Sequence, residues 1–427
     1  MNGKKVVCAG LLAVSTAIPA KVLSQIVVID AEIRPRTEMR DGFKSPNAEG
    51  KDPGIFTSQR TRLGLTYTSG LLNAQVTLQD ARVYGQFASS APEASTGLYE
   101  GWAELVLVPG GTLKVGRQTI KYDDSRLFSA PAWSNSGTTH DMALFKYNLN
   151  DWQLHLGMAY NNNSEISSET LYANTVKYRS MAFAWLSKDL FPGLNASVLF
   201  VDEGLQDTVG VGLAYKKIKM NHALTYGGNL KYQTPGSELT VLGTAYFQSG
   251  KNIKGKDMSG SLYALKVDYA PFAFLAFNAG ADYLSGDDKA SDGKQTNFKK
   301  LYGADHTFNG VMDYWDAPLD QGLLDFYGGF SPKISKNLNG DVAYHLFQTD
   351  KALSNGGRKL GSELDLILNY RLNAQSMLQA GWCWYFTNDN TLLAKKITAG
   401  TKINPPQWAY VMLTIKPTFF NTKTNQL

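Results

Sequence analysis

Charged and uncharged residues alternate strictly over residues 30–40, and this alternation constrains the fold more than any other feature of the chain. In "DAEIRPRTEMR" every second residue is charged, six in all, and the residues between them carry no charge. A period of two predicts an extended strand whose two faces meet different surroundings. We therefore expect an uncharged face against lipid and a charged face against water.

The N-terminal segment predicts export. Two lysines precede the uncharged apolar run "VVCAGLLAVSTAIPA", which is too short to span a bilayer, and small residues follow it. This order is typical of a secretory signal peptide, so we assign residues 1–24 to one. No later apolar run is long enough for a membrane-spanning helix.

Charge, cysteine and histidine content exclude several classes of function. Loss of Lys4, Lys5 and Lys21 with the signal peptide lowers the net charge from +5 to +2, which gives no reason to expect a nucleic-acid partner. Cys383 is then the one remaining cysteine, so an internal disulfide or a cysteine metal site is excluded. The five histidines lie in no nucleophile or zinc motif. We predict no cofactor, no metal and no enzymatic activity; a membrane-embedded hydrolase with a loop-borne site is the competing reading.

Alternating segments recur along the whole mature chain. They predict eighteen antiparallel strands, at residues 26–40, 56–68, 72–85, 96–108, 111–120, 141–148, 151–161, 178–188, 193–203, 219–233, 237–250, 257–269, 272–286, 321–331, 338–348, 360–371, 374–387 and 404–420. Connections after even-numbered strands are short, and the others are mostly long and polar. This layout is typical of an all-β transmembrane barrel with short periplasmic turns and long extracellular loops. We predict the barrel over residues 25–420 and a polar periplasmic tail over residues 421–427.

Two features interrupt the pattern. Residues 204–218 are expected to form a loop, although "VGVGLAY" within them has the alternation of a further strand. Pro35 and Pro417 each remove a hydrogen bond from the strand ladder. We expect both prolines at bulges or near the membrane boundaries.

Three stretches resemble the alginate-export family of outer-membrane proteins. They are "FTSQRTRLGLTY" (56–67), "LKVGRQTIKYDDSRLFSAPAWSNSGTTHDMALFKY" (113–147) and "GADHTFNGVMDYW" (303–315). The resemblance implies an eighteen-stranded barrel in the outer membrane whose long loops fold over or into the pore. From it we expect residues 121–140 and 287–320, which follow the fifth and thirteenth strands, to form a constriction.

Candidate pore residues lie on the charged strand faces and in these two loops. They are Asp30, Glu32, Arg34, Arg36, Glu38, Arg60, Arg62, Glu104, Lys114, Arg117, Asp124, Arg126, Trp133, Asn135, Asp141, His306, Asp313 and Tyr314. The basic residues either bind carboxylated or phosphorylated solutes, or pair with the nearby glutamates and stiffen the wall. Trp133 either stacks on a sugar, or its loop is a plug fixed by Asp–Arg pairs.

The inward charges are mixed, with a basic sector on the first, second and fifth strands and an acidic sector on strands fourteen to sixteen. Sectors of opposite charge orient polar solutes and argue against a conduit for the polyanion alginate. We predict a porin-like channel for passive passage of small polar or charged solutes or oligosaccharides. Expected partners are outer-membrane lipid, the solute and the barrel-assembly machinery during biogenesis. The alternative is a plugged barrel that serves as a structural subunit of a larger envelope complex.

Overall fold

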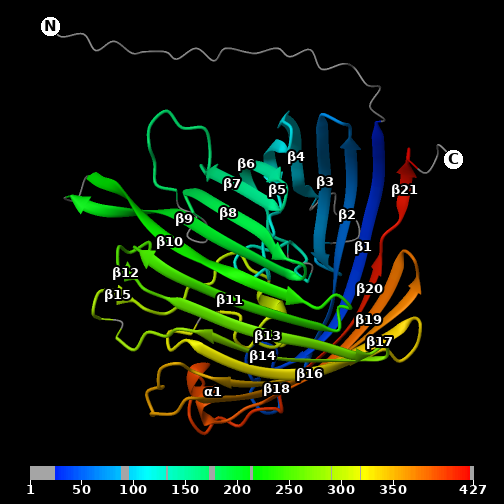
Figure 1. The fold of residues 1–427 in the computed structure, drawn as a ribbon. Coiled ribbons are helices and arrows are strands. Elements are labelled where there is room, and N and C mark those ends of the chain that lie inside the picture. Colours follow the sequence, from blue (N-terminus) through cyan, green and yellow to red (C-terminus); the bar gives the residue numbers. More distant parts are fainter. Residues whose placement is uncertain are drawn as a thin grey trace, which may run out of the picture.

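The computed structural model describes residues 25–87, 96–130, 133–172, 178–211, 215–289, 291–317 and 319–423. The predicted signal peptide and the last four residues of the predicted tail lie outside these ranges. The described chain forms one large antiparallel sheet that closes on itself (Figure 1).

Nineteen strand segments form this sheet. They are β1 (Ile26–Asp41), β2 (Gly54–Thr68), β3 (Leu72–Val83), β4 (Gly97–Val108), β5 (Gly111–Gln118), β6 (His140–Leu149), β7 (Trp152–Tyr160), β8 (Ser180–Phe191), β9 (Leu194–Val211), β10 (Tyr215–Gln233), β11 (Leu239–Gly250), β13 (Ser261–Phe272), β14 (Leu275–Leu284), β16 (Leu323–Pro332), β17 (Leu338–Gln348), β18 (Lys359–Asn373), β19 (Ser376–Phe386), β20 (Gln407–Ile415) and β21 (Thr418–Asn421). β20 and β21 are two parts of one final strand, so the barrel has eighteen strands and the predicted fold class is confirmed.

The connecting segments contain four short elements. β12 (Asp257–Met258) and β15 (Lys294–Gln295) form a small parallel sheet. The 3-10 helix η1 (Asp305–Thr307) and the helix α1 (Asp389–Ala394) lie in two other connections. Across the described ranges, no helix is long and apolar enough to cross a membrane.

The predicted loop at residues 204–218 is wrong. β9 and β10 continue through most of this range, and they stay in register from the Leu194–Tyr232 pair to the Val211–Tyr215 pair. The described residues of "VGVGLAY", which are 209–211 and 215, therefore lengthen β9 and β10 and do not form a separate strand. Continued pairing satisfies backbone groups that a loop would leave to solvent.

The barrel closes where β1 pairs with β20 and β21. The register between β1 and β21 shifts between Ile29 and Asp30, next to the break that contains Pro417. Pro417 thus lies at an irregularity, as expected for a residue that cannot donate to the ladder. Pro35 instead lies in the middle of β1, opposite Gln59 in an unbroken register.

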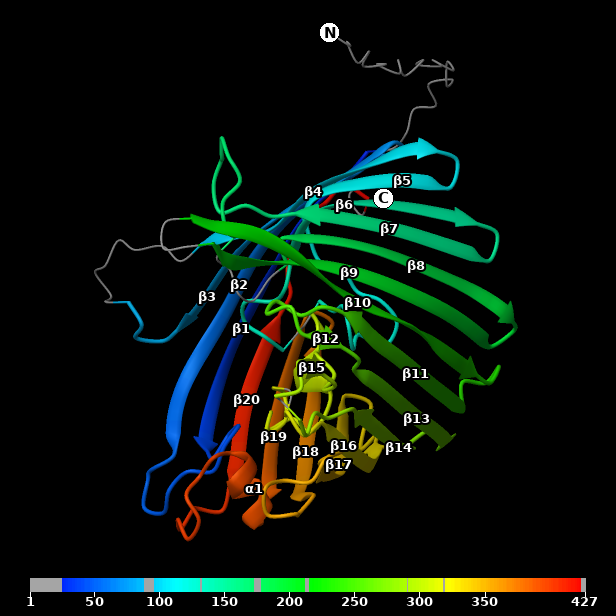
Figure 2. The same cartoon turned by 90° about the vertical axis from the view of Figure 1, so that its left-hand side faces the viewer.

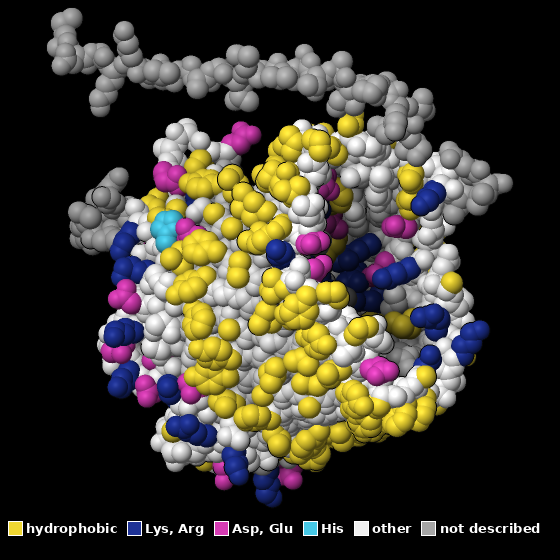
Figure 3. Space-filling model, viewed as in Figure 1, with side chains coloured by type: hydrophobic (Ala, Val, Ile, Leu, Met, Phe, Trp, Pro, Cys, Tyr) yellow, Lys and Arg dark blue, Asp and Glu magenta, His cyan; other side chains and the backbone are white. Residues whose placement is uncertain are grey.

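The two ends of the barrel differ. The short turns and both described termini lie at one end, here named the turn end, and the long connections lie at the other, the loop end (Figure 1). The outer face is rich in hydrophobic side chains, and a hollow near the turn end contains Lys, Arg, Asp and Glu side chains (Figure 3). Leu368, Tyr370 and Val411 are among the exposed apolar residues of this outer face.

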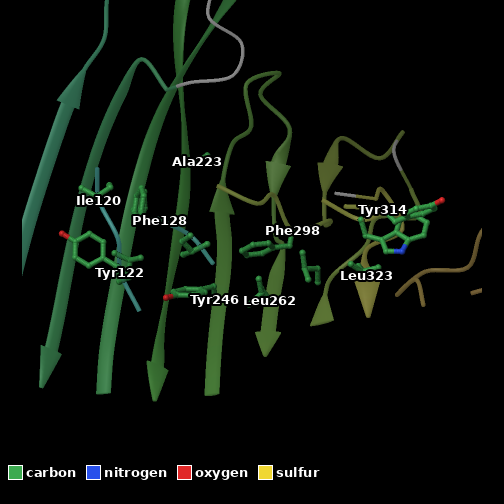
Figure 4. Close-up of a cluster of buried hydrophobic side chains, with 14 of the residues drawn as sticks. Ile120, Tyr122, Phe128, Ala223, Tyr246, Leu262, Phe298, Tyr314 and Leu323 are labelled. Carbon is green, nitrogen blue, oxygen red and sulfur yellow. The ribbon is translucent and has the colours of Figure 1, made fainter. Parts of the chain in front are cut away.

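Two long connections enter the barrel, and Figure 2 shows loop segments inside the ring of strands. We name residues 119–139 the first inserted loop and residues 285–322 the second inserted loop. Phe128 of the first loop and Phe298 of the second are fully buried with Tyr246 of β11 in one apolar cluster (Figure 4). The sequence predicted a polar inner face and did not predict this interior core. The reason is that the sequence does not show which wall residues the apolar loop residues contact.

Candidate pore constriction

Three arginines of β1 and β2 hold the first inserted loop by its backbone. Arg34 and Arg36 donate hydrogen bonds to the carbonyl oxygen of Trp133, at 2.8 and 3.0 Å. Arg60 donates to the carbonyl oxygen of Ser134 at 2.7 Å. The alternation of both strands places these side chains on the inner face, where charge-assisted hydrogen bonds fix the loop against the wall.

Two of these arginines, and Lys146 of β6, also pair with acidic neighbours on the wall. The ion pairs are Arg60 with Glu32 (2.6 Å), Arg36 with Glu38 (2.8 Å), and Lys146 with Glu104 (2.9 Å). The geometry therefore favours the wall-stiffening reading of these charges over a row of free anion sites. Desolvated charges that are paired and hydrogen-bonded avoid the cost of isolated burial.

The indole ring of Trp133 contacts side chains of the wall and of the second inserted loop. The Arg36 guanidinium lies 3.8 Å from the centroid of the indole ring. The His306 ring of the second inserted loop stacks on the indole, with centroids 4.2 Å apart, and His306 in turn bonds Asp313 at 2.7 Å. Trp133 thus joins the two loops, and this geometry opposes the expectation that its ring stacks on a sugar.

Arg126 fastens the first inserted loop to the opposite wall. Its guanidinium makes two bonds with Asp282 of β14, at 2.7 and 2.8 Å, and one with Asp124 at 2.9 Å. The Phe308 ring of the second loop lies 4.1 Å from this guanidinium. Burial disfavours the charged form of Arg126, but Asp282 and Asp124 more than offset it and raise its pKa, so Arg126 stays charged.

A second anchor of the first loop is Asp123, the acidic residue that precedes Asp124. Its carboxylate accepts hydrogen bonds from Trp185 (2.9 Å), Ser197 (2.6 Å) and Tyr246 (2.9 Å). These donors come from three strands of the same part of the wall, β8, β9 and β11. The sequence places Asp123 in this loop beside Asp124, but it does not reveal the three donors, which are far away in the chain.

The acidic wall lies on β16 to β18. Asp325, Glu363 and Asp365 are all nearly fully buried there. His345 bonds Asp325 at 2.9 Å, and Glu363 accepts a hydrogen bond of 2.7 Å from the backbone of Met312 in the second inserted loop. The predicted acidic sector therefore meets the second loop, as the basic sector meets the first.

The other candidate residues have these positions. Arg62 and Lys114 lie on the inner face over aromatic rings, 3.6 Å from the centroids of Tyr99 and Trp102 respectively. Asp30 is exposed near the turn end. Two candidates lie in the loops: the Asn135 side chain accepts from Arg34 (2.8 Å), and Tyr314 donates to the carbonyl of Gly42 (2.7 Å).

Arg117 and Asp141 were predicted to line the pore, and the structure corrects this. They pair with each other at 2.9 Å, and the Asp141 side chain is 61% exposed. Asp141 alternates with Met142, which is buried inside the barrel, and Arg117 shares the strand phase of the exposed Val115. Both side chains therefore point to the outer face near the loop end, because a strand sends neighbouring residues to opposite sides.

Comparison with known proteins agrees with this architecture. The model of the family described as "Alginate export" matches residues 27–179. OpdO of Pseudomonas aeruginosa is similar with a TM-score of 0.65 at 14% identity, over 92% of this chain and 98% of that chain. OccAB1 of Acinetobacter baumannii gives 0.63 at 12% identity, over 92% and 97% of the two chains. The P. aeruginosa OpdK structure with vanillate gives 0.57 at 13% identity, over 92% and 99%. No curated protein matches the chain.

A closed eighteen-stranded barrel with an apolar outer face and loops folded inside it is an outer-membrane β-barrel of porin-like architecture. The resemblance noted in the sequence is confirmed over residues 27–179, which the alginate-export model matches. Among the residues whose placement the structure gives, no group of three His, Cys, Asp or Glu side chains is arranged to hold a metal ion.

Proposed function

We propose that this chain is a channel through which small polar or charged solutes, including short oligosaccharides, cross the outer membrane passively. The observation that carries the proposal is that two inserted loops lie between a basic wall on β1 and β2 and an acidic wall on β16 to β18. Opposed charges in a low-dielectric wall orient polar solutes and tune selectivity. A lumen of mixed charge is a poor conduit for a polyanion such as alginate.

The size of the cargo has separate support. The OpdK structure is described with vanillate, a small carboxylic acid. Because a barrel of the same fold has a structure with a small solute, we infer a small solute for this chain too. Outer-membrane lipid and the barrel-assembly machinery are its expected partners.

The test is single-channel conductance of the purified chain in planar bilayers, with the reversal potential measured under a salt gradient. A steady open current with weak ion preference is the expected result. Strong anion selectivity would contradict the mixed-charge lumen and favour export of a polyanion. Absence of current from a folded, heat-modifiable barrel would overturn the channel itself.

A plugged structural subunit is the second candidate, and the apolar core inside the barrel favours it. Phe128 of the first inserted loop and Phe298 of the second belong to one buried apolar cluster with Tyr246 of the wall. This cluster fills part of the barrel interior. Replacing residues 121–138 by a short Gly-Ser linker separates the two functions. A channel gains conductance when this loop is removed, whereas a subunit that is closed in the wild type loses its assembly into a larger complex.

A further inference from the structure

A cavity of about 370 Å³ lies between the two inserted loops and the wall of β11 to β18. Arg126 and Phe308 border it on the loop side. Leu242, Asn278 and Asp341 border it on the wall, and each lies three residues from the turn-end bound of its strand. The cavity therefore lies on the turn side of the constriction, and its size is in the range of small-molecule sites.

Acidic side chains outnumber basic ones in the lining of this cavity. Its lining contains the carboxylates of Asp124, Asp282, Asp341 and Asp365, and the cations of Arg126 and Lys266. The first two carboxylates share the single positive charge of Arg126 through the pairs described above. Lys266 pairs with Asp268 at 3.0 Å. Asp341 and Asp365 are left as the negative end of the cavity, and His345 lies beside them.

Two acceptor atoms at this end lack a hydrogen bond within the described chain. They are Oδ1 of Asn309 and Oδ1 of Asp365. Both side chains line the cavity, and the two residues are 2% and 3% exposed. His345 does not supply a donor to this oxygen of Asp365, because its Nδ1 bonds Asp325 and its Nε2 lies 3.8 Å from the other oxygen. The other polar neighbours of Asp365 are the Glu363 carboxyl, the Cys383 thiol and the backbone N–H of Val311. Buried acceptors without donors are costly, so both atoms are suited to a ligand that donates.

We propose that this acidic pocket, formed by Asn278, Asn309, Asp341, His345 and Asp365, binds small hydroxylated solutes that carry a protonated amine. The ammonium group lies against Asp365 and Asn309, and hydroxyl groups reach Asp341 and Asn278. The proposal rests on the channel function and gives its lumen a substrate class. The Phe308 ring faces Arg126 and belongs to the loop anchor, so the pocket recognises the solute through charge and hydrogen bonds.

The test compares three sugars of matched size, namely glucosamine, glucose and glucuronate, at pH 6, where the amine is protonated. Binding to the purified full chain is measured by calorimetry, which does not require an open pore. Current block in bilayers is measured separately. A folded barrel that binds glucosamine but carries no current would overturn the channel function and support the pocket. We expect glucosamine to bind about tenfold more tightly than glucose, and glucuronate to bind more weakly than either.

Asp365→Asn removes the charge and keeps the size of the side chain. We expect it to weaken glucosamine binding about tenfold, towards the affinity for glucose. The matched control is Asp202→Asn on the outer face of β9, where Asp202 bonds His222, and it leaves binding unchanged. If Asp365→Asn does not fold, Asn309→Ala replaces it. Equal binding of the three sugars, or wild-type binding by a folded Asp365→Asn barrel, would refute the proposal.

Discussion

Arg126 of the first inserted loop and Asp282 of β14 form a two-point ion pair inside the barrel, with N–O distances of 2.7 and 2.8 Å. The two residues are 156 positions apart in the sequence. The pair therefore fixes a loop from one side of the barrel to a strand on the other.

Substitution Arg126→Gln leaves the buried Asp282 carboxylate without its cation. We expect the free energy of unfolding to fall by about 3–5 kcal/mol, because an uncompensated buried charge is expensive. Urea unfolding in lipid vesicles measures this loss, and the released loop should also raise single-channel conductance. The double variant Arg126→Met, Asp282→Leu should recover much of the stability but keep the raised conductance. A single variant as stable as the wild type would show that the pair does not hold the loop.

Trp133→Ala tests the junction of the two inserted loops. Loss of the contacts with Arg36 and His306 should lower stability by about 3 kcal/mol and increase conductance. Sugar binding in the acidic pocket should persist, because the indole ring is committed to protein partners. Trp152→Ala, at an exposed position near the turn end, is the control. Abolished sugar binding by a well-folded Trp133→Ala barrel would restore the stacking role.

Arg62→Gln and Arg117→Gln remove the same charge from opposite faces of the barrel. Arg62 lies on the inner face near Gln79, and Arg117 lies on the outer face with Asp141. The reversal potential should therefore shift towards cation preference in Arg62→Gln and stay unchanged in Arg117→Gln. An equal shift in both variants would mean that Arg117 faces the pore.

Lys395, at the end of α1, makes stability depend on pH. Burial lowers its pKa to about 8, with repulsion from Lys44 adding to the effect and Asp316 opposing it. Between this value and the ordinary pKa of lysine the unfolded chain binds more protons than the folded one, so stability rises with pH across that window. Lys395→Met should remove this dependence and stabilise the barrel at neutral pH. Melting temperatures from pH 7 to about 10 check it, and a wild-type curve that falls over this range would contradict it.

The barrel was predictable because its signal is local. Alternation along each strand and the regular change between short and long connections fix strand number and the two faces, without knowledge of distant contacts. The same reasoning placed Arg34, Arg36 and Arg60 on the inner face. It failed for Arg117 and Asp141, whose charged side chains were expected to point into the pore. The phase of their strands directs both side chains outward.

The constriction was predictable only in part. Asp124, Arg126 and His306 were expected in it, but Asp282 was not. Nothing near Asp282 in the sequence distinguishes it from other polar residues on the inner phase of β14. Its role depends on Arg126, whose position relative to β14 is set by closure of the sheet. The unpartnered acceptors of Asn309 and Asp365 likewise arise only when a loop meets a wall.

The sequence by itself determined an exported, eighteen-stranded barrel with an apolar outside and a charged inside, because a strand's period and a membrane's thickness are properties of short segments. The tertiary structure alone decided which charges neutralise one another, how the two inserted loops pack, and where an acidic pocket remains. Those outcomes depend on distances between residues far apart in the chain, and ion pairs and buried hydrogen bonds fall off within a few ångströms.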